Sequence, residues 1–394
     1  MDRMHLDPEK LTTILLDLKR VRQLFDVADR DNNNLMNQID IREDLPLAGI
    51  RVVDFSGLLP GPLATLMLRR AGAEVIKIES PGGDAMRTLP DDGGRLFSIL
   101  NRGKRSVCVD LKDARQKTKV IDLLAGADVV VEQFRPGVAD KLGIGYADCR
   151  KRRDDIVYCS ISGFGQSGPM RGFAGHDINY LAHTGMLDLF AGVDGPVPPP
   201  MLLADVIGGA YPAFNNIVLA LYKRLRNGAG SYIDIAMTNG LHALNVPLVA
   251  QTHPSRESEP QSALQLDGST ARYRCYCCAD GGWIAVGALE EKFWRRLCQL
   301  IELNDGYGSK NAADPQLIKA VAERFHLKSR HEWLQLFAGE DVCCNAVRDF
   351  ADGLAEVVDA RDTSLELPLA AQFDDDEIDH KAPALGEGNR EFLA

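Results

Sequence analysis

The sequence has no long apolar run. Among its 394 residues the longest unbroken apolar stretches, such as 217–222, are far shorter than the roughly 20 residues of a membrane-spanning helix. The first residues, MDRMHLDPEK, lack the apolar core of a secretory leader and the acid-poor character of a transit peptide. We therefore expect a soluble protein with no membrane partner in the cytosol. A mitochondrial or peroxisomal location stays open for a eukaryotic source.

Cysteine and metal motifs of recognisable spacing are also absent. The nine cysteines are an odd number spread over a long chain, which is not typical of a disulfide framework and indicates a reducing compartment. Cys275 and Cys278 form a C-x-x-C, but no second pair lies at the spacing of a zinc ribbon. No H-E-x-x-H, Walker A or G-x-S-x-G motif occurs. We expect no metal site.

Acidic residues outnumber basic ones in the chain as a whole, 56 to 45. The formal net charge of -11 argues against nucleic acid as a partner. Residues 69–119 are different, because they carry twelve Lys or Arg residues against seven Asp or Glu residues. A basic segment in an acidic protein suggests a small anionic ligand, and a solvated surface is the alternative explanation.

The apolar patterns indicate an α/β fold. From Gly49 onward, short strand patterns alternate with helical ones: GIRVVDFS, PGPLATLMLRRAG, AEVIKIE, SVCVDL, the run 113–125, DVVVEQF and DIVYCSIS. This alternation predicts βαβ units and a parallel sheet. A helical pattern from Ala210 to Leu225 ends near Gly228, and the strand SYIDIAM follows. YRCYCC and WIAVGAL around the turn ADGG predict a β-hairpin. The chain length favours two domains.

The stretch SISGFGQSGPMRGFAGHDINY contains glycines from Gly163 to Gly168 at the spacing of a dinucleotide-binding fingerprint. The strand DIVYCSIS precedes them, and Asp188 lies 20 residues after Gly168. The helix that such a site needs is missing, because Pro169 and two further glycines interrupt it. We interpret the glycines as shaping a loop whose end presents His176.

Three ionisable residues are candidates for catalytic groups. His176 and Asp177 stand at the start of an apolar helical pattern. Asp205 stands at the start of the next helical pattern, where a carboxylate caps free amides and needs no other role. Gly208 and Gly209 weaken that helix, however, which suggests that something such as a ligand thioester approaches its backbone closely.

Seven segments together resemble a known family. GIRVVDFSGLLPGPLATLMLRRAGAEVIKIESP, NRGKRSVCVDLK, VVEQFRPGV, SGFGQSGP, AGHDINYLAHTGML, LLADVIGGA and YRCYCCADGGWIAVGALE are similar, in this order, to segments of the family III CoA-transferases and racemases, the CaiB/BaiF superfamily. AGHDINY and VGALE are most similar to the α-methylacyl-CoA racemase branch. The resemblance runs from about Leu45 to the C-terminus.

The resemblance implies a fold and an assembly. It implies an interlocked homodimer, in which each chain has a Rossmann-like large domain with a parallel sheet and a smaller α+β domain. Coenzyme A is expected as part of an acyl-CoA substrate, with no separate cofactor. The expected divisions are a helical extension at 1–44, a large CoA-binding domain at 45–230 completed by about 345–394, and a linker with the small domain at 231–344.

The resemblance also implies roles for individual residues. His176 and Asp205 match the racemase acid/base pair, Glu290 matches the carboxylate that orients the histidine, and Asp177 belongs to the same site. Expected CoA-binding positions are Lys77, Arg105, Val109, Asp110, Leu111, Lys112, Phe134 and Arg135, which would explain the basic segment. Expected substrate-binding positions are Gly175, Ile178, Asn179 and Tyr180. Ser80 departs from the family, because an arginine usually stands there.

Racemisation of a 2-methylacyl-CoA thioester is the implied reaction. An α-proton leaves one face of the carbon and another returns to the opposite face, so two proton carriers must flank it. Backbone amides after Asp205 would then stabilise the enolate. CoA transfer through an aspartyl-CoA thioester on Asp205 is the alternative, although such transferases generally lack the histidine. A non-catalytic acyl-CoA-binding protein is a third reading. Met186, Leu187, Leu189 and Phe190 hint at an apolar acyl pocket.

Overall fold

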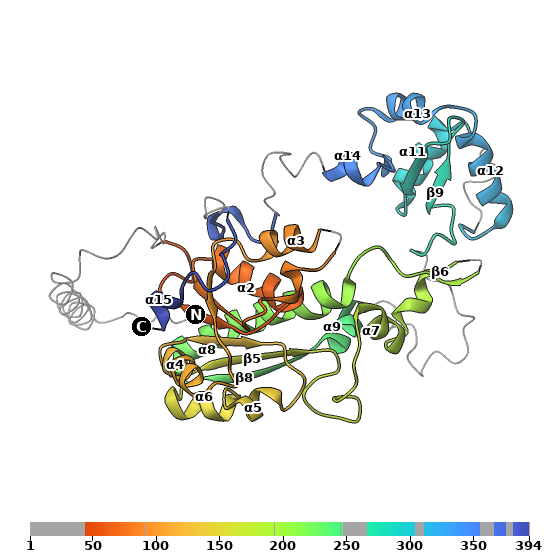
Figure 1. Cartoon of the computed structure of the whole chain (residues 1–394). Coiled ribbons are helices and arrows are strands. Elements are labelled where there is room, and N and C mark those ends of the chain that lie inside the picture. The colour runs from red at the N-terminus through yellow and green to blue at the C-terminus, as the bar shows by residue number, and fades with distance from the viewer. Residues whose placement is uncertain are drawn as a thin grey trace, which may run out of the picture. The chain divides into compact units, whose positions relative to one another are not determined.

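The computed structural model describes residues 44–90, 92–192, 194–244, 246, 266–303, 311–354, 366–375 and 381–393 (Figure 1). The chain divides between Asp44 and Leu45, where the sequence predicts the end of the N-terminal extension. The helix predicted within that extension lies outside the described residues. No helix in the described ranges is long and apolar enough to cross a membrane.

A six-stranded, fully parallel sheet organises the large domain. Its strand order is β3-β2-β1-β4-β5-β8, with strands β1 Arg51–Asp54, β2 Glu74–Glu79, β3 Arg105–Cys108, β4 Val129–Glu132, β5 Val157–Ser162 and β8 Ser231–Ala236. The parallel sheet that the alternating patterns predict is confirmed, and its order is the Rossmann-like architecture that the family resemblance implies.

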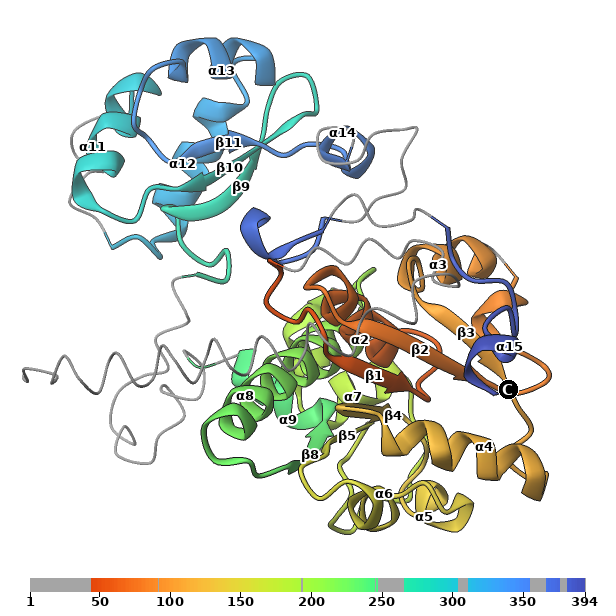
Figure 2. The same ribbon diagram turned by 90° about the vertical axis from the view of Figure 1, so that its left-hand side faces the viewer.

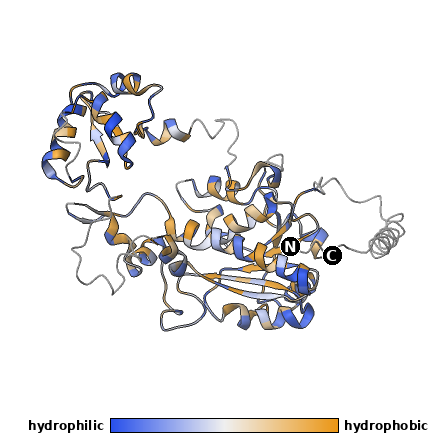
Figure 3. Ribbon diagram, turned by 180° about the vertical axis from the view of Figure 1, so that it is seen from behind, coloured by the Kyte–Doolittle hydropathy of each residue, from blue (hydrophilic) through white to orange (hydrophobic). Residues whose placement is uncertain are grey.

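The central strands are rich in apolar residues because both faces of the sheet are covered there. Val129 and Val131 pack into the core that includes α2 Pro60–Arg70 and α8 Tyr211–Asn227. Val130, between them, packs into the core shared with α4 Ala114–Ala125 and α6 Tyr146–Arg152. Figure 2 shows α2 and α8 on one side of the sheet and α4 and α6 on the other. In Figure 3 the strands are mostly hydrophobic, whereas the outer helices carry hydrophilic faces.

The helix boundaries follow local sequence signals. Asp113 caps α4 by accepting from the amides of Arg115 and Gln116, and α8 ends at Gly228, which has a φ of 70°. The remaining elements of the large domain are η1 Ala85–Arg87, α3 Gly93–Leu100, α5 Val138–Leu142, α7 Asp177–His183, η2 Met186–Phe190, β6 Ala191–Gly192, β7 Gly195–Pro196, η3 Ala204–Ala210, α9 Met237–Leu244, η6 Ala371–Phe373 and α15 Asn389–Phe392. Of these, η3 is a π-helix that runs directly into α8.

The sheet continues past residue 230. β8 pairs with β5 along its whole length, so Ser231–Ala236 is the outer strand of the large sheet rather than part of a linker. α9 then packs against η3, where Gly208 and Gly240 bring the two backbones into contact. The C-terminal segment returns to the same domain: Gly388 donates to the carbonyl of Ser106, and the side chain of Asn389 bonds both backbone groups of Cys108.

The second folded part is a small α+β unit. β9 Tyr273–Cys277 and β10 Trp283–Gly287 form the predicted antiparallel hairpin, and β11 Cys344–Ala346 pairs with β10 on its other side. Trp294, Phe325 and Trp333 are buried in its core. Its helices are α11 Glu291–Leu300, α12 Pro315–Phe325 and α13 Arg330–Phe337, and α14 Phe350–Leu354 follows β11.

Candidate functional site

Two pockets lie where the connections of the large sheet diverge. β1 and β4 are neighbours in the sheet, and the chain turns away from them in opposite directions, which is the place where open parallel sheets bind ligands. The loops after these strands supply Leu58, Gln133 and Phe134 to both pockets. We name the pockets after one residue of each, His176 and Lys112.

The His176 pocket has a volume of 460 Å³. Its described lining comes from the loops after β1, β4 and β5 and from α7, η3 and α9: Leu58, Pro60, Gln133, Phe134, Arg135, Pro136, Ile161, Ser162, Gly163, Phe164, Arg171, Phe173, Ala174, Gly175, His176, Asn179, Tyr180, Asp205 and Met237. The structure thus brings His176 and Asp205, which are 29 positions apart in sequence, into one cavity.

The glycine loop presents His176, as the sequence predicts. Residues 163–176 form no helix between β5 and α7. The ring of Tyr180 occupies the space beside two of the glycines, since a Cβ added to Gly163 or Gly175 would lie 2.2 or 2.7 Å from it. The Tyr180 hydroxyl also donates to the carbonyl of Gly175 at 2.6 Å. Tyr180 therefore fixes the residue that precedes the histidine.

His176 is the residue before α7, and its side chain is exposed to the pocket. Its backbone N–H donates to the side-chain oxygen of Asn179 at 3.0 Å. Asn179, predicted to bind substrate, thus holds the backbone of the histidine. Ile178, predicted for the same role, is 44% exposed and is not part of the pocket lining.

Asp177, and not Asp205, caps the helix that contains Asp205. The buried carboxylate of Asp177 accepts the backbone N–H of Asp205 at 2.9 Å. Asp205 lies inside the first turn of η3. The predicted capping role of Asp205 is therefore wrong, because a carboxylate from the start of α7 satisfies the free amide of this turn.

Because the amide of Asp205 is already bonded to Asp177, it is not a free donor for an enolate oxygen. The next amide, that of Val206, donates to the carbonyl of Leu202 at 3.0 Å. The first amide after Asp205 is therefore not free either, and the expectation that amides of this helix stabilise an enolate stays a prediction for the later ones.

The pKa of Asp205 is raised to about 6. Burial is the largest cause, the nearby Asp177 carboxylate adds to it, and His176 opposes it. Burial also raises the pKa of Asp177, against the effect of the backbone bonds that it accepts. A carboxyl group with a pKa near 6 can both give and take a proton close to neutral pH.

The sequence predicts that a ligand approaches the backbone closely at Gly208 and Gly209. In the structure other residues of the protein occupy the space beside these two glycines. A Cβ on Gly208 would lie 2.4 Å from the carbonyl oxygen of Met237, and a Cβ on Gly209 would lie 3.0 Å from Pro60. The glycines allow α9 and α2 to pack on η3. They do not mark the place of a ligand.

The Lys112 pocket has a volume of 410 Å³. It gathers six of the eight predicted CoA-binding positions, namely Lys77, Val109, Asp110, Leu111, Lys112 and Phe134, together with Ser80. Arg135 is exposed and lines the His176 pocket instead. Arg105 lines neither pocket, because it begins β3 at the opposite end of the strand, where it pairs with Glu391.

Six of the twelve cations of the basic segment are structural. Their described partners are carboxylates or carbonyls in the domain: Arg69 with the carbonyl of Gly103, Arg70 with Asp374, Lys77 with Asp84, Arg87 with Glu79, Lys104 with Asp54 and Arg105 with Glu391. Lys112 is exposed and remains suited to a phosphate. Pairing within the domain therefore explains these six cations, whereas others of the segment, such as Lys112 and Arg115, are exposed to solvent.

Glu290 stands before α11 in the small unit and is not among the described lining residues of the His176 pocket. Met186, Leu187, Leu189 and Phe190 do not line the pocket either, so the predicted source of an apolar acyl site is not found there. Sequence reasoning missed Leu58, Gln133 and Arg171, whose only signal was a position after a strand or in the glycine loop.

No group of three or more His, Cys, Asp or Glu side chains suited to a metal ion occurs in the described part of the chain. All nine cysteines are free thiols. Cys275 and Cys278 belong to the hairpin, where the first is exposed and the second is buried.

Comparison with known proteins identifies the family. The α-methylacyl-CoA racemase of Mus musculus is 37% identical over 312 residues, covering 78% of this chain and 79% of the relative. The human succinyl-CoA:glutarate CoA-transferase is 32% identical over 333 residues, covering 81% and 75%. The crystal structure of Rv3272 from Mycobacterium tuberculosis matches with a TM-score of 0.77 at 28% identity, over 89% of this chain and 99% of that one. The model of CoA-transferase family III matches residues 47–387. This chain belongs to CoA-transferase family III.

Proposed function

We propose that this protein is a racemase that inverts the α-carbon of 2-methylacyl-CoA thioesters. The observation that carries the proposal is the pairing of His176 with Asp205 in one pocket, with the pKa of Asp205 raised to about 6. A racemase needs two groups that both exchange protons near neutral pH, and an imidazole and this carboxyl group have that property.

The proposed step moves one proton at a time. One of the two groups removes the α-proton as a base, which leaves an enolate, and the other returns a proton to the opposite face of the same carbon. For the opposite enantiomer the two groups exchange roles. The resulting product has the same composition as the substrate and the opposite configuration.

We place the nucleotide part of CoA in the Lys112 pocket and the thioester in the His176 pocket. The two pockets share Leu58, Gln133 and Phe134, so a ligand longer than either pocket can pass this boundary. Lys112 is the proposed phosphate contact, because Lys77 is buried and already paired.

We further propose an interlocked homodimer in which Glu290 of the second copy completes the site. Mixing His176→Ala subunits with Glu290→Ala subunits tests this. If each site takes Glu290 from the partner, mixed dimers regain one intact site and part of the activity, whereas unmixed variants stay inactive.

Deuterium exchange followed by NMR tests the main proposal. With a purified 2-methylacyl-CoA enantiomer in deuterated water and no acceptor acid, the α-proton signal is expected to disappear and both enantiomers to converge on a racemate. His176→Ala and Asp205→Ala should each abolish exchange. His183→Ala, which changes a histidine on the same helix outside the pocket lining, is the matched control. An exchange rate equal to that of the wild type in either variant would contradict the assignment of these two residues as proton carriers.

CoA transfer between carboxylic acids is the alternative, supported by the 32% identity to a CoA-transferase. In that reaction the Asp205 carboxylate attacks the thioester carbonyl and releases CoA, which then attacks the resulting anhydride to form an aspartyl-CoA thioester and free the acid. Hydroxylamine trapping of Asp205 during turnover with an added acid, without α-proton exchange, would favour it. Binding without either reaction would indicate a non-catalytic acyl-CoA-binding protein.

A further inference from the structure

Leu58 occupies an unusual position between the two pockets. Its φ is 60°, in the left-handed region that favours glycine, and its side chain is 38% exposed and lines both pockets. A leucine keeps this backbone conformation only when the surroundings hold it there. The contacts that hold it are therefore part of how the boundary between the pockets is built.

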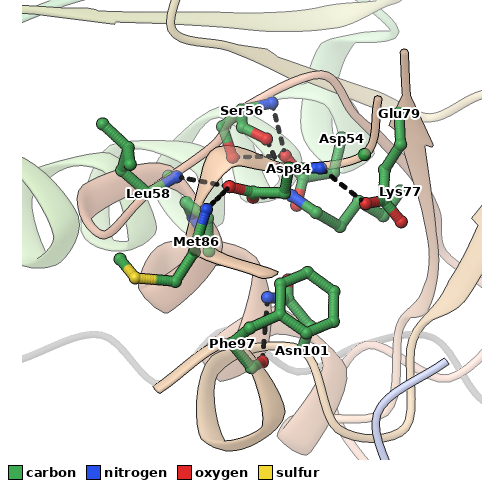
Figure 4. Close-up of polar contacts among 12 residues, drawn as sticks. Asp54, Ser56, Leu58, Lys77, Glu79, Asp84, Met86, Phe97 and Asn101 are labelled. Carbon is green, nitrogen blue, oxygen red and sulfur yellow. Dashed lines mark hydrogen bonds and ion pairs between the residues drawn. The ribbon is translucent and has the colours of Figure 1, made fainter. Parts of the chain in front are cut away.

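A buried ion pair holds the loop on both sides of Gly57. The ammonium group of Lys77 lies 2.9 Å from the carboxylate of Asp84 and donates to the carbonyl of Ser56 at 2.8 Å. The other carboxylate oxygen of Asp84 accepts the backbone N–H of Leu58 at 3.3 Å. Figure 4 shows Lys77 and Asp84 beside the loop, with their contacts to Ser56 and Leu58.

Asp84 is itself fixed from two directions. Its carboxylate accepts the amide of Met86 at 2.9 Å, and its own N–H donates to Glu79 at 2.9 Å. Glu79 in turn is held by two bonds from Arg87 and one from Ser106. The side chains of Lys77 and Asp84 are only 1% and 2% exposed, so the pair is almost completely removed from solvent although both residues border the Lys112 pocket.

We propose that the Lys77–Asp84 pair is a positioning device that holds Leu58 as the wall between the two pockets and so sets the passage for the thioester arm of the ligand. The identity of the ligand rests on the proposed function. Lys77 and Asp84 act through Leu58 and do not contact the reacting atoms.

The proposal and simple electrostatics predict opposite changes in ligand affinity when Asp84 loses its charge. Asp84 lines the Lys112 pocket, so replacing its charge by Asp84→Asn removes a repulsion toward an anionic ligand and would by itself tighten binding. A positioning role predicts the opposite, because an amide no longer pairs with Lys77 and the loop at Leu58 is released.

Calorimetry with two ligands measures binding of the nucleotide end separately from binding of the thioester arm. Adenosine 3′,5′-bisphosphate probes the Lys112 pocket alone, and a non-reactive thioether analogue of 2-methylacyl-CoA spans both pockets. For Asp84→Asn we expect the analogue to bind about tenfold more weakly, whereas the bisphosphate, which meets only the lost repulsion in the Lys112 pocket, should bind equally well or more tightly. The KM for α-proton exchange should rise about tenfold, with kcat falling less than threefold. Unchanged or tighter binding of the analogue would overturn the proposal.

A double-mutant cycle with Leu58→Gly tests whether Asp84 affects analogue binding through Leu58. Glycine adopts a φ of 60° without strain, so Asp84→Asn should weaken analogue binding less than threefold in that background. A full tenfold effect there would show that Asp84 acts independently of Leu58. Leu58→Gly alone should also weaken binding of the analogue and leave binding of the bisphosphate unchanged. This variant tests the proposal if Asp84→Asn does not fold.

Asp374→Asn is the control, because it breaks another largely buried pair, with Arg70, that touches neither pocket. It should lower stability and leave both affinities unchanged. If the wild-type protein itself fails to bind the analogue, the proposed function falls together with this inference. If the wild type binds and Asp84→Asn binds equally well, this inference alone falls.

Discussion

The backbone N–H of Asp205 donates to the carboxylate of Asp177 at 2.9 Å. The residue directly after the histidine thus holds the helix that carries the second proposed proton carrier. The same carboxylate is one of the two causes that raise the pKa of Asp205. Asp177 therefore links the placement of Asp205 to its proton affinity.

Asp177→Asn should lower the pKa of Asp205 below its value of about 6. Asparagine keeps an oxygen that can accept the amide bonds but removes the like charge. The titration of the Asp205 carboxyl carbon, followed by carbon-13 NMR, measures the shift, and the acid side of the exchange profile should move to lower pH. An unchanged midpoint would show that burial alone sets the pKa of Asp205.

Asp205→Asn should abolish exchange and yet stabilise the protein at neutral pH. The pKa of Asp205 lies above its ordinary value of 3.8, so the unfolded chain ionises first and the charged form is disfavoured in the fold. This cost is absent below about pH 3.8, grows as pH rises, and is complete above about pH 6. The Tm of Asp205→Asn should therefore exceed that of the wild type at pH 7.5, with the difference closing toward pH 4. A difference that does not depend on pH contradicts this reasoning.

Gly208→Ala should destabilise the large domain by about 1–3 kcal/mol or more, because the new Cβ would lie 2.4 Å from the carbonyl of Met237 and the helices must separate. Gly172→Ala is the matched control, since a Cβ there meets nothing within 4 Å. Urea unfolding compares the two variants. Equal free energies of unfolding would mean that η3 and α9 do not pack this closely.

Lys104→Met should cost about 3–5 kcal/mol of unfolding free energy, because it leaves the buried carboxylate of Asp54 without its cation. Lys104 also donates to Thr65 and Asn101 at 2.8 and 2.9 Å, so these bonds are lost as well. Lys151→Met removes a surface pair with Asp148 and should cost less than about 1 kcal/mol. Comparable losses in the two variants would show that the network around Asp54 is not specifically stabilising.

Much of the architecture could be predicted from short sequence patterns. Strand runs such as 129–131 are apolar on both faces, which only a covered parallel sheet requires, and caps such as Asp113 act within one helical turn. The hairpin of β9 and β10 followed from two strand patterns around a glycine turn. These features depend on residues that are close together in the chain, so their physical cause is visible in a short window.

The sequence alone determined the α/β class, the glycine loop that ends at His176, and the candidacy of His176 and Asp205. Only the tertiary structure decided which partner each charge meets. In the fold Asp177 accepts the amide of Asp205 at the start of η3, Met237 makes the close approach at Gly208, and Arg70, Lys104 and Arg105 of the basic segment pair with carboxylates far away in sequence. The physical reason is that burial and charge pairing depend on distances between residues that the fold brings together, and no local pattern records those distances.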